Sequence, residues 1–82
     1  MADKLDKDDL KFKKKIVERL REIRESMGKN QTEFAYELNL DRQVINRIES
    51  GSGTSIYMIR RYCRLAGLRL KDFFDSPLFK ED

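Results

Sequence analysis

The segment that decides the fold runs from Asn30 to Gly51 and reads NQTEFAYELNLDRQVINRIESG. Asn30 and Glu33 have the spacing of a capping box, in which the N-cap and the third helical residue bond each other's backbone N–H groups. Asn39 tolerates a positive φ angle better than most residues, so it can end this helix in a tight turn. The segment therefore predicts a first short helix, whose inner face is Phe34, Ala35 and Leu38.

A second short helix is predicted to follow directly, from an N-cap at Asp41 to an end near Ser50-Gly51. Ile45 and Ile48 are spaced to point into a core. The remaining faces carry polar side chains near the N-terminal half of this helix, namely Arg42, Gln43, Asn46 and Arg47.

The polar outer face has the chemistry needed to read DNA. The major groove admits a helix, and there Arg can bond guanine and Gln can bond adenine through two hydrogen bonds each. Val44 lies near the outward side and could contact a thymine methyl group. An ordinary amphipathic helix with a charged surface has the same spacing, so periodicity alone leaves both interpretations open.

A longer helix is predicted before this pair and two shorter ones after it. The first has an apolar stripe, a candidate cap at Asp8 or Asp9 and a candidate end at Gly28. The fourth begins after the loop 50–55, capped by Thr54 or Ser55, and ends at Gly67. The apolar stripes are Phe12, Ile16, Leu20, Ile23 and Met27 for the first helix, Ile56, Ile59, Cys63 and Ala66 for the fourth, and Leu68, Leu70, Phe73 and Phe74 for a short fifth.

The fold class predicted from these patterns is all-α, with five helices and no alternating strand pattern. The chain has 82 residues, enough for one compact domain. We expect a flexible charged lead-in over residues 1–9, the domain itself over 10–76, and a C-terminal tail over 77–82, because Pro77 blocks continuation of the last helix.

The amino-acid composition narrows the classes of protein to which the chain can belong. The net charge of +3 is weak support for nucleic-acid binding, and the run Lys13–Lys15 is interpreted as a solvated helix face rather than a targeting signal. Cys63 is the only cysteine, which fits a reducing compartment and a buried apolar role. Because no signal peptide or membrane-length apolar run is visible, a cytoplasmic protein is expected.

Catalysis, metal binding and cofactor binding have no candidate residues. The chain has no histidine, no Gly-rich phosphate loop and no nucleophile beside a base, and its acidic residues form no metal-like cluster. Tyrosines in helices usually pack their rings and keep their hydroxyl groups in water, which is the expectation for Tyr36, Tyr57 and Tyr62. We therefore expect a binding protein rather than an enzyme.

Residues 16–74 resemble the phage repressor and Cro-like helix-turn-helix family, which has the lambda-repressor-like fold. The resemblance is carried by five blocks in the family's order: Asn30–Ala35, Ile45–Gly51, Ser55-Ile56, Leu65–Leu68, and the ending Leu70, Phe73 and Phe74. It implies a compact five-helix domain that binds double-stranded DNA, usually as a homodimer on a palindromic operator. Half-sites about one helical turn apart would match two recognition helices across a two-fold axis.

The resemblance also implies roles for individual residues. Arg42, Gln43 and Arg47 match positions that reach base edges. Gln31 matches a position that contacts phosphate and braces the recognition helix, with Asn30 beside it and Asn46 at the rim. Arg24 and Glu49 match a structural ion pair between the first and third helices.

Two further expectations concern contacts outside the recognition helix. The loop Gly51–Thr54 is uncharged where the family often has basic residues, so Ser52 and Thr54 are expected to meet phosphate through hydroxyl and backbone N–H groups. The C-terminal apolar residues exceed what a small core readily absorbs, so they should either fold back onto the core or form a partner surface. The family often dimerises through its last helix, and the resemblance therefore favours a dimer interface of Leu70, Phe73, Phe74, Leu78 and Phe79. The leading hypothesis is a homodimeric transcriptional regulator, most simply a repressor; the alternative is an antitoxin-like or other module that binds a partner protein, with or without DNA.

Overall fold

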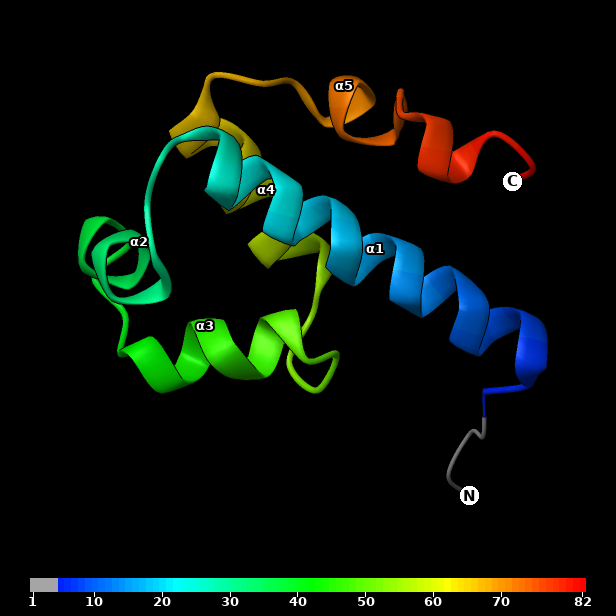
Figure 1. Ribbon diagram of the computed structural model, residues 1–82, viewed down its shortest axis with the longest axis horizontal. Helices are drawn as coiled ribbons and strands as arrows, with labels where there is room; N and C mark the ends of the chain where they lie inside the picture. Colours follow the sequence, from blue (N-terminus) through cyan, green and yellow to red (C-terminus); the bar gives the residue numbers. More distant parts are fainter. Residues whose placement is uncertain (1–4) are drawn as a thin grey trace.

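The computed structural model describes residues 5–82, which form five α-helices and a final 3-10 turn, with no strand among them (Figure 1). The all-α, five-helix prediction is confirmed. The elements are α1 (Lys7–Ser26), α2 (Gln31–Glu37), α3 (Arg42–Glu49), α4 (Ile56–Ala66), α5 (Leu70–Phe74) and η1 (Pro77–Phe79). None of these helices combines the length and the apolar character needed to span a bilayer.

Helix α1 begins earlier than predicted. The cap is Asp6, whose Oδ1 accepts from the Asp9 N–H at 2.8 Å while the Asp9 carboxylate accepts from the Asp6 N–H. Asp8 and Asp9, predicted as caps, lie instead in the first turn, where negative charge is favoured by the helix dipole. The expected lead-in therefore ends at Asp6; residues 1–4 of it lie outside the described residues.

The α2–α3 pair forms as its local signals predict. Asn30 Oδ1 accepts from the Glu33 N–H at 2.8 Å, and Glu33 Oε1 accepts from the Asn30 N–H at 2.9 Å. Asn39 has a φ of 58°, and the Leu40 N–H donates to the Ala35 carbonyl at 2.9 Å. These bonds close a tight turn, so α3 leaves α2 at a fixed angle (Figure 1).

Helix α4 buries the predicted face, with Ile59 and Cys63 in the core and Ala66 packed against it, but two of its residues differ from their predictions. Ser55 caps it and Gly67 ends it with a φ of 75°, as expected. Ile56, however, is 53% exposed, whereas Tyr62 is completely buried. Ile56 is the first residue of α4 and projects past the core, and Tyr62 lies three residues after buried Ile59 on the same stripe.

One apolar core joins the helices. Side chains from every α-helix meet in it, and the ring centroids of Phe34 and Tyr62 lie 4.4 Å apart. Burying one large apolar side chain contributes roughly 1.5–3 kcal/mol, so a few such residues account for most of a small domain's stability. The largest fully buried apolar residues are Leu20, Ile23, Phe34, Ile45, Ile48, Cys63 and Phe73, with Tyr62.

The C-terminal residues pack onto the N-terminal half of α1. Phe79 is 8% exposed, and its ring centroid lies 6.0 Å from that of Phe12. Lys15 Nζ lies 2.7 Å from a carboxylate oxygen of Asp82. Residues 77–82, expected to form a tail, are therefore packed against the domain, because Phe79 supplies an apolar surface that the short α5 lacks.

Candidate nucleic-acid interface

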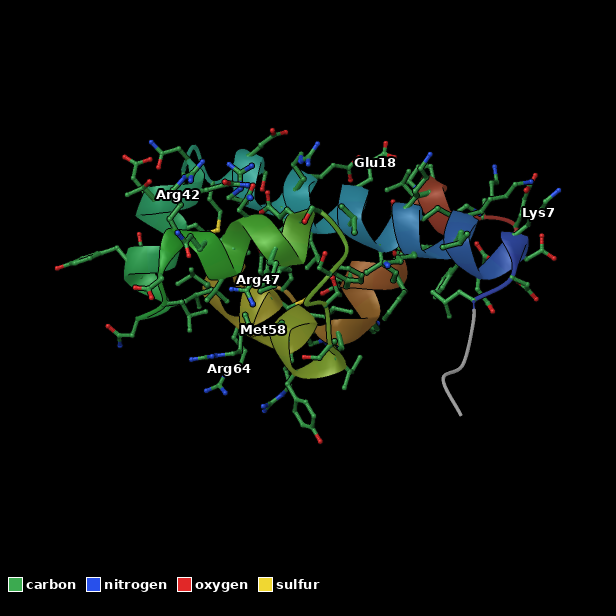
Figure 2. All side chains as sticks on the ribbon, turned by 90° about the horizontal axis from the view of Figure 1, so that it is seen from below. Lys7, Glu18, Arg42, Arg47, Met58 and Arg64 are labelled. Atoms are coloured by element: carbon green, nitrogen blue, oxygen red, sulfur yellow. The ribbon has the colours of Figure 1, made fainter. Side chains whose placement is uncertain are left out.

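Helix α3 presents a polar face outward and a buried face inward. Arg42, Gln43, Asn46 and Arg47 are all exposed, whereas Ile45, Ile48 and Glu49 are at most 1% exposed. Figure 2, seen from below relative to Figure 1, looks onto this side of α3 with Arg42 and Arg47 labelled. The four polar residues that the sequence places on the outer face are thus all free of the core.

Val44 has a different environment from its polar neighbours. Its side chain is half-buried and packs against the apolar core. Only its remaining surface is open to a base, so its predicted contact with a thymine methyl is the most restricted of the four base contacts.

The inner face of α3 is held by a buried carboxylate. Arg24 Nε donates to Glu49 Oε2 at 2.8 Å, and Arg24 Nη2 donates to Glu49 Oε1 at 3.0 Å. The guanidinium also donates from Nη1 to the Lys29 carbonyl at 2.8 Å. A two-pronged Arg–carboxylate pair fixes direction as well as distance, so α1 and α3 are locked in register at this point.

Side chains from two more helices donate hydrogen bonds to the Glu49 carboxylate. Tyr62 Oη on α4 donates to Glu49 Oε2 at 2.9 Å, and Gln31 Nε2 on α2 donates to Glu49 Oε1 at 3.3 Å. In this position Gln31 braces α3, as the resemblance implies for one of its two roles. We call Arg24, Glu49, Gln31 and Tyr62 the Glu49 network; it links α1, α2, α3 and α4.

Tyr62 is the functional residue that the sequence analysis missed. Its hydroxyl was expected to remain in water, but it is buried and bonded to Glu49. The signal was present in the spacing, because Tyr62 follows Ile59 by three residues and so shares its inward face.

The pKa values of Tyr62 and Arg24 are both raised in the folded chain, for different reasons. Burial raises the pKa of the Tyr62 phenol far above its usual 10, and the negative charge of Glu49 adds to that shift. The hydrogen bond to Glu49 raises the pKa of Arg24. Both groups therefore keep their protons near neutral pH, so Arg24 is charged and the Tyr62 phenol is neutral.

The loop after α3 uses most of its hydroxyl groups internally. Thr54 Oγ1 donates to the Ile48 carbonyl at 2.9 Å, and Ser50 Oγ donates to the Arg47 carbonyl at 3.0 Å. Ser52 is exposed. Of the two loop residues predicted to meet phosphate, Ser52 is accessible, while Thr54 has its hydroxyl proton engaged and has only its oxygen lone pairs to offer.

Asn30 and Asn46, both predicted to contact the DNA backbone, are exposed. Asn30 caps α2 with its side-chain oxygen, and its residue is exposed. Asn46 is exposed on α3. Both can face a DNA backbone without leaving their positions in the fold.

The five residues predicted to form a dimer interface separate into two groups. Phe73 is completely buried and Phe79 nearly so, and both pack within their own chain. Leu70 and Phe74 are 36% and 38% exposed, and Leu78 is half-buried. The surface left for a partner copy is therefore centred on Leu70 and Phe74, because Phe73 and Phe79 are needed to complete the core.

Over residues 5–82, no three metal-ligating side chains gather into a group that could hold an ion. Cys63 is a buried free thiol whose pKa is raised by burial. It is therefore the inert apolar residue that the sequence predicts.

Comparison with known proteins agrees with this geometry. A family model described as helix-turn-helix matches residues 20–73, more than half of the chain, and confirms the resemblance found in the sequence. A protein of Pyrococcus furiosus named "Putative HTH-type transcriptional regulatory protein" is 38% identical over 63 residues, which are 77% of this chain and 18% of that protein. The chain thus spans less than a fifth of that relative's length. No solved structure matches.

Proposed function

This chain belongs to the helix-turn-helix family of DNA-binding domains, and from that premise we propose that it regulates transcription by sequence-specific binding of double-stranded DNA. In this proposal α3 lies in the major groove and the domain acts as a homodimer on a palindromic operator, most simply as a repressor. The name of the Pyrococcus furiosus relative supports the regulatory role.

The observation that carries the proposal is the contrast between the two faces of α3. Four polar side chains with base-reading chemistry project outward, while the inner face is fixed to three other helices through Glu49. Base readout needs donors and acceptors held in a set direction, since a two-pronged contact tolerates little displacement. A charged helix face with no recognition role would need no such support.

The residue roles follow from position. Arg42, Gln43 and Arg47 would contact base edges, with Val44 adding an apolar contact. Backbone phosphates would be met by Asn46, Ser52 and the N-terminal end of α2, where Asn30 and Gln31 lie. Gln31 can serve both DNA and Glu49, since an amide has two N–H donors and one of them bonds Glu49.

The central test is selection of bound duplexes from a random pool with the full chain. The expected result is an enriched sequence with two inverted half-sites about one helical turn apart, or roughly 34 Å. A pool that stays random would contradict sequence-specific binding, and a single enriched half-site would contradict the dimer.

Substitution on α3 tests the assigned residues on the selected duplex. Arg42→Ala and Arg47→Ala should each weaken binding by about 5- to 150-fold per half-site, the range given by roughly 1–3 kcal/mol for a two-pronged base contact. Arg64→Ala removes an equal charge from exposed α4 and serves as the matched control. Equal effects of all three substitutions would remove Arg42 and Arg47 from the recognition surface.

A further inference from the structure

The N-terminal half of α1 extends beyond the segment that the helix-turn-helix model matches. Helix α1 starts at Lys7, whereas the matched segment starts at residue 20. At 1.5 Å per residue, the additional helix is about 20 Å long. Figure 1 shows this half, in blue, extending past the C-terminal end of α3 and descending toward the level of that helix.

An open groove of about 1000 Å³ lies between this half of α1 and the residues Ser50 and Gly51, which directly follow α3. Leu10 and Val17 are its apolar residues. Five basic side chains line it against a single acidic one: Lys7, Lys11, Lys13, Lys14 and Arg21, with Glu18.

Gly51 permits the two walls of the groove to meet. Its φ is 92°, and a Cβ built on it would lie 2.8 Å from Cε of Lys13. The aliphatic stem of Lys13 therefore lies across the glycine, with its ammonium group beside the end of the recognition helix. Any larger residue at position 51 would displace Lys13.

The charges of the groove are not neutralised within the described part of the chain. Lys15, on another side of α1, pairs with Asp82, and Arg21 lies 3.9 Å from Glu49. Over residues 5–82, no ion pair within 4.0 Å involves the four lysines Lys7, Lys11, Lys13 and Lys14. A groove lined by several such cations attracts a polyanion.

The groove is continuous with the surface that α3 presents. It starts at Ser50, one residue after α3 ends, and the adjoining loop Gly51–Thr54 has no charged side chain. In Figure 2, Lys7 and Glu18 on α1 are visible from the same side as Arg42 and Arg47 on α3. A duplex read by α3 would therefore pass the groove with its flanking phosphates.

We propose that the N-terminal half of α1 is a second contact surface for the sugar-phosphate backbone of the DNA that α3 reads, which Lys11 and Lys14 bind without regard to base sequence. The inference rests on the proposed function. In this proposal α1 supplies the positive charge at this end of the DNA-binding surface, because the loop Gly51–Thr54 after α3 has no charged side chain.

The test compares two charge-matched double variants of the full chain. Lys11→Gln with Lys14→Gln removes two exposed cations from the groove, and Lys71→Gln with Lys80→Gln removes two exposed cations from α5 and the C-terminal end. Binding is measured from 50 to 200 mM salt on the selected duplex and on an unrelated duplex. Since each phosphate contact contributes about 0.9 to the slope of log K against log salt, the groove variant should lose about 1.8 of that slope for each bound protomer, or about 3.6 for the proposed dimer, on both duplexes.

A substitution that removes a negative charge from the groove provides a second test. Glu18→Gln removes the only acidic side chain of the groove and should tighten binding on both duplexes by about two- to threefold, mostly at low salt. Glu81→Gln, an equal change at the C-terminal end, should have a smaller effect. Equal salt slopes for the two lysine variants, with no gain from Glu18→Gln, would overturn the inference.

The failure of the inference is distinguishable from failure of the proposed function. If Arg42→Ala weakens binding but the two lysine variants behave alike, α3 reads DNA and α1 does not contact it. If the unsubstituted chain binds neither duplex, the proposed function itself fails. Crosslinking of the groove to an acidic protein in place of DNA would also overturn the inference.

Discussion

Glu49 shows how one buried residue can set the position of a recognition helix. Its two oxygens accept from Arg24, Gln31 and Tyr62, so every donor direction around the carboxylate is defined. Taking an ion pair out of water is costly and is repaid only when the geometry is good and the other lone pairs are satisfied. Its main effect here is therefore to fix the angle of α3.

Glu49→Gln should destabilise the domain by about 3–5 kcal/mol, because it leaves Arg24 charged, nearly buried and without its partner. Urea unfolding followed by circular dichroism measures the change. Glu25→Gln is the matched control, since Glu25 also faces Arg24, at 4.0 Å, but is well exposed. The control should change stability by less than about 1 kcal/mol; equal losses would show that the network is not a special support.

Because of Tyr62, the free energy of unfolding is expected to depend on pH in the alkaline range. Its pKa is raised in the folded chain, whereas the unfolded phenol ionises near 10, so above pH 10 the folded state holds one proton more. The free energy of unfolding should therefore be intact below pH 10 and fall above it by about 1.4 kcal/mol per pH unit. Tyr62→Phe should lack this decline, although it is less stable at neutral pH.

Chemical denaturation at pH 8 to 11 compares the two proteins. Cys63 also has a pKa raised by burial, but it is present in both and its contribution cancels in the difference. If the free energies of unfolding of the two proteins change in parallel above pH 10, the phenol ionises in the folded state.

At the scale of single elements, the ends of the helices were more predictable from sequence than their buried faces. The Asn30–Glu33 capping box, the positive φ of Asn39 and the Gly67 ending depend only on neighbouring residues, and the structure has all three. Ile56 and Tyr62 were assigned to the wrong environments because the stripe of α4 depends on how the helix meets α1 and α3. Tertiary packing decides that, and local spacing only limits it.

The turn that ends α3 gives a prediction at this scale. Gly51→Ala should destabilise the domain by about 1–3 kcal/mol, because position 51 has a φ of 92° and the new Cβ meets Lys13. Gly53→Ala, two residues on, is the control: its φ is not positive and its Cβ would lie no closer than 3.7 Å to any neighbour. Thermal unfolding of both variants measures the difference, and equal midpoints would contradict strain at Gly51.

At the scale of the whole molecule, the C-terminal residues determine how much apolar surface remains exposed. Phe73 and Phe79 complete the core, and Phe79 also joins α1 to the last turn through Phe12. The sequence indicated an excess of apolar residues here, but their division between core and surface depends on a non-local contact over more than sixty residues. Composition cannot show such a contact.

The proposed dimer can be tested without disturbing the core. Leu70→Gln with Phe74→Gln changes the two exposed apolar residues of α5 and should convert a dimer to a monomer in sedimentation velocity. Ile56→Gln with Tyr57→Gln alters two equally large exposed residues on α4 and should leave the dimer intact. A dimer that persists in the α5 variant would place the interface on another surface.

The Glu49 network has a consequence for how such a protein can change. Every group that holds α3 in place lies on its inner face, so residues 42, 43, 46 and 47 make no contribution to that support. In the proposed mode of DNA binding, folding and target choice are therefore encoded in different residues of one eight-residue helix. A library randomised at these four positions should yield folded proteins with new operator preferences, and natural divergence could retarget the domain by the same few substitutions.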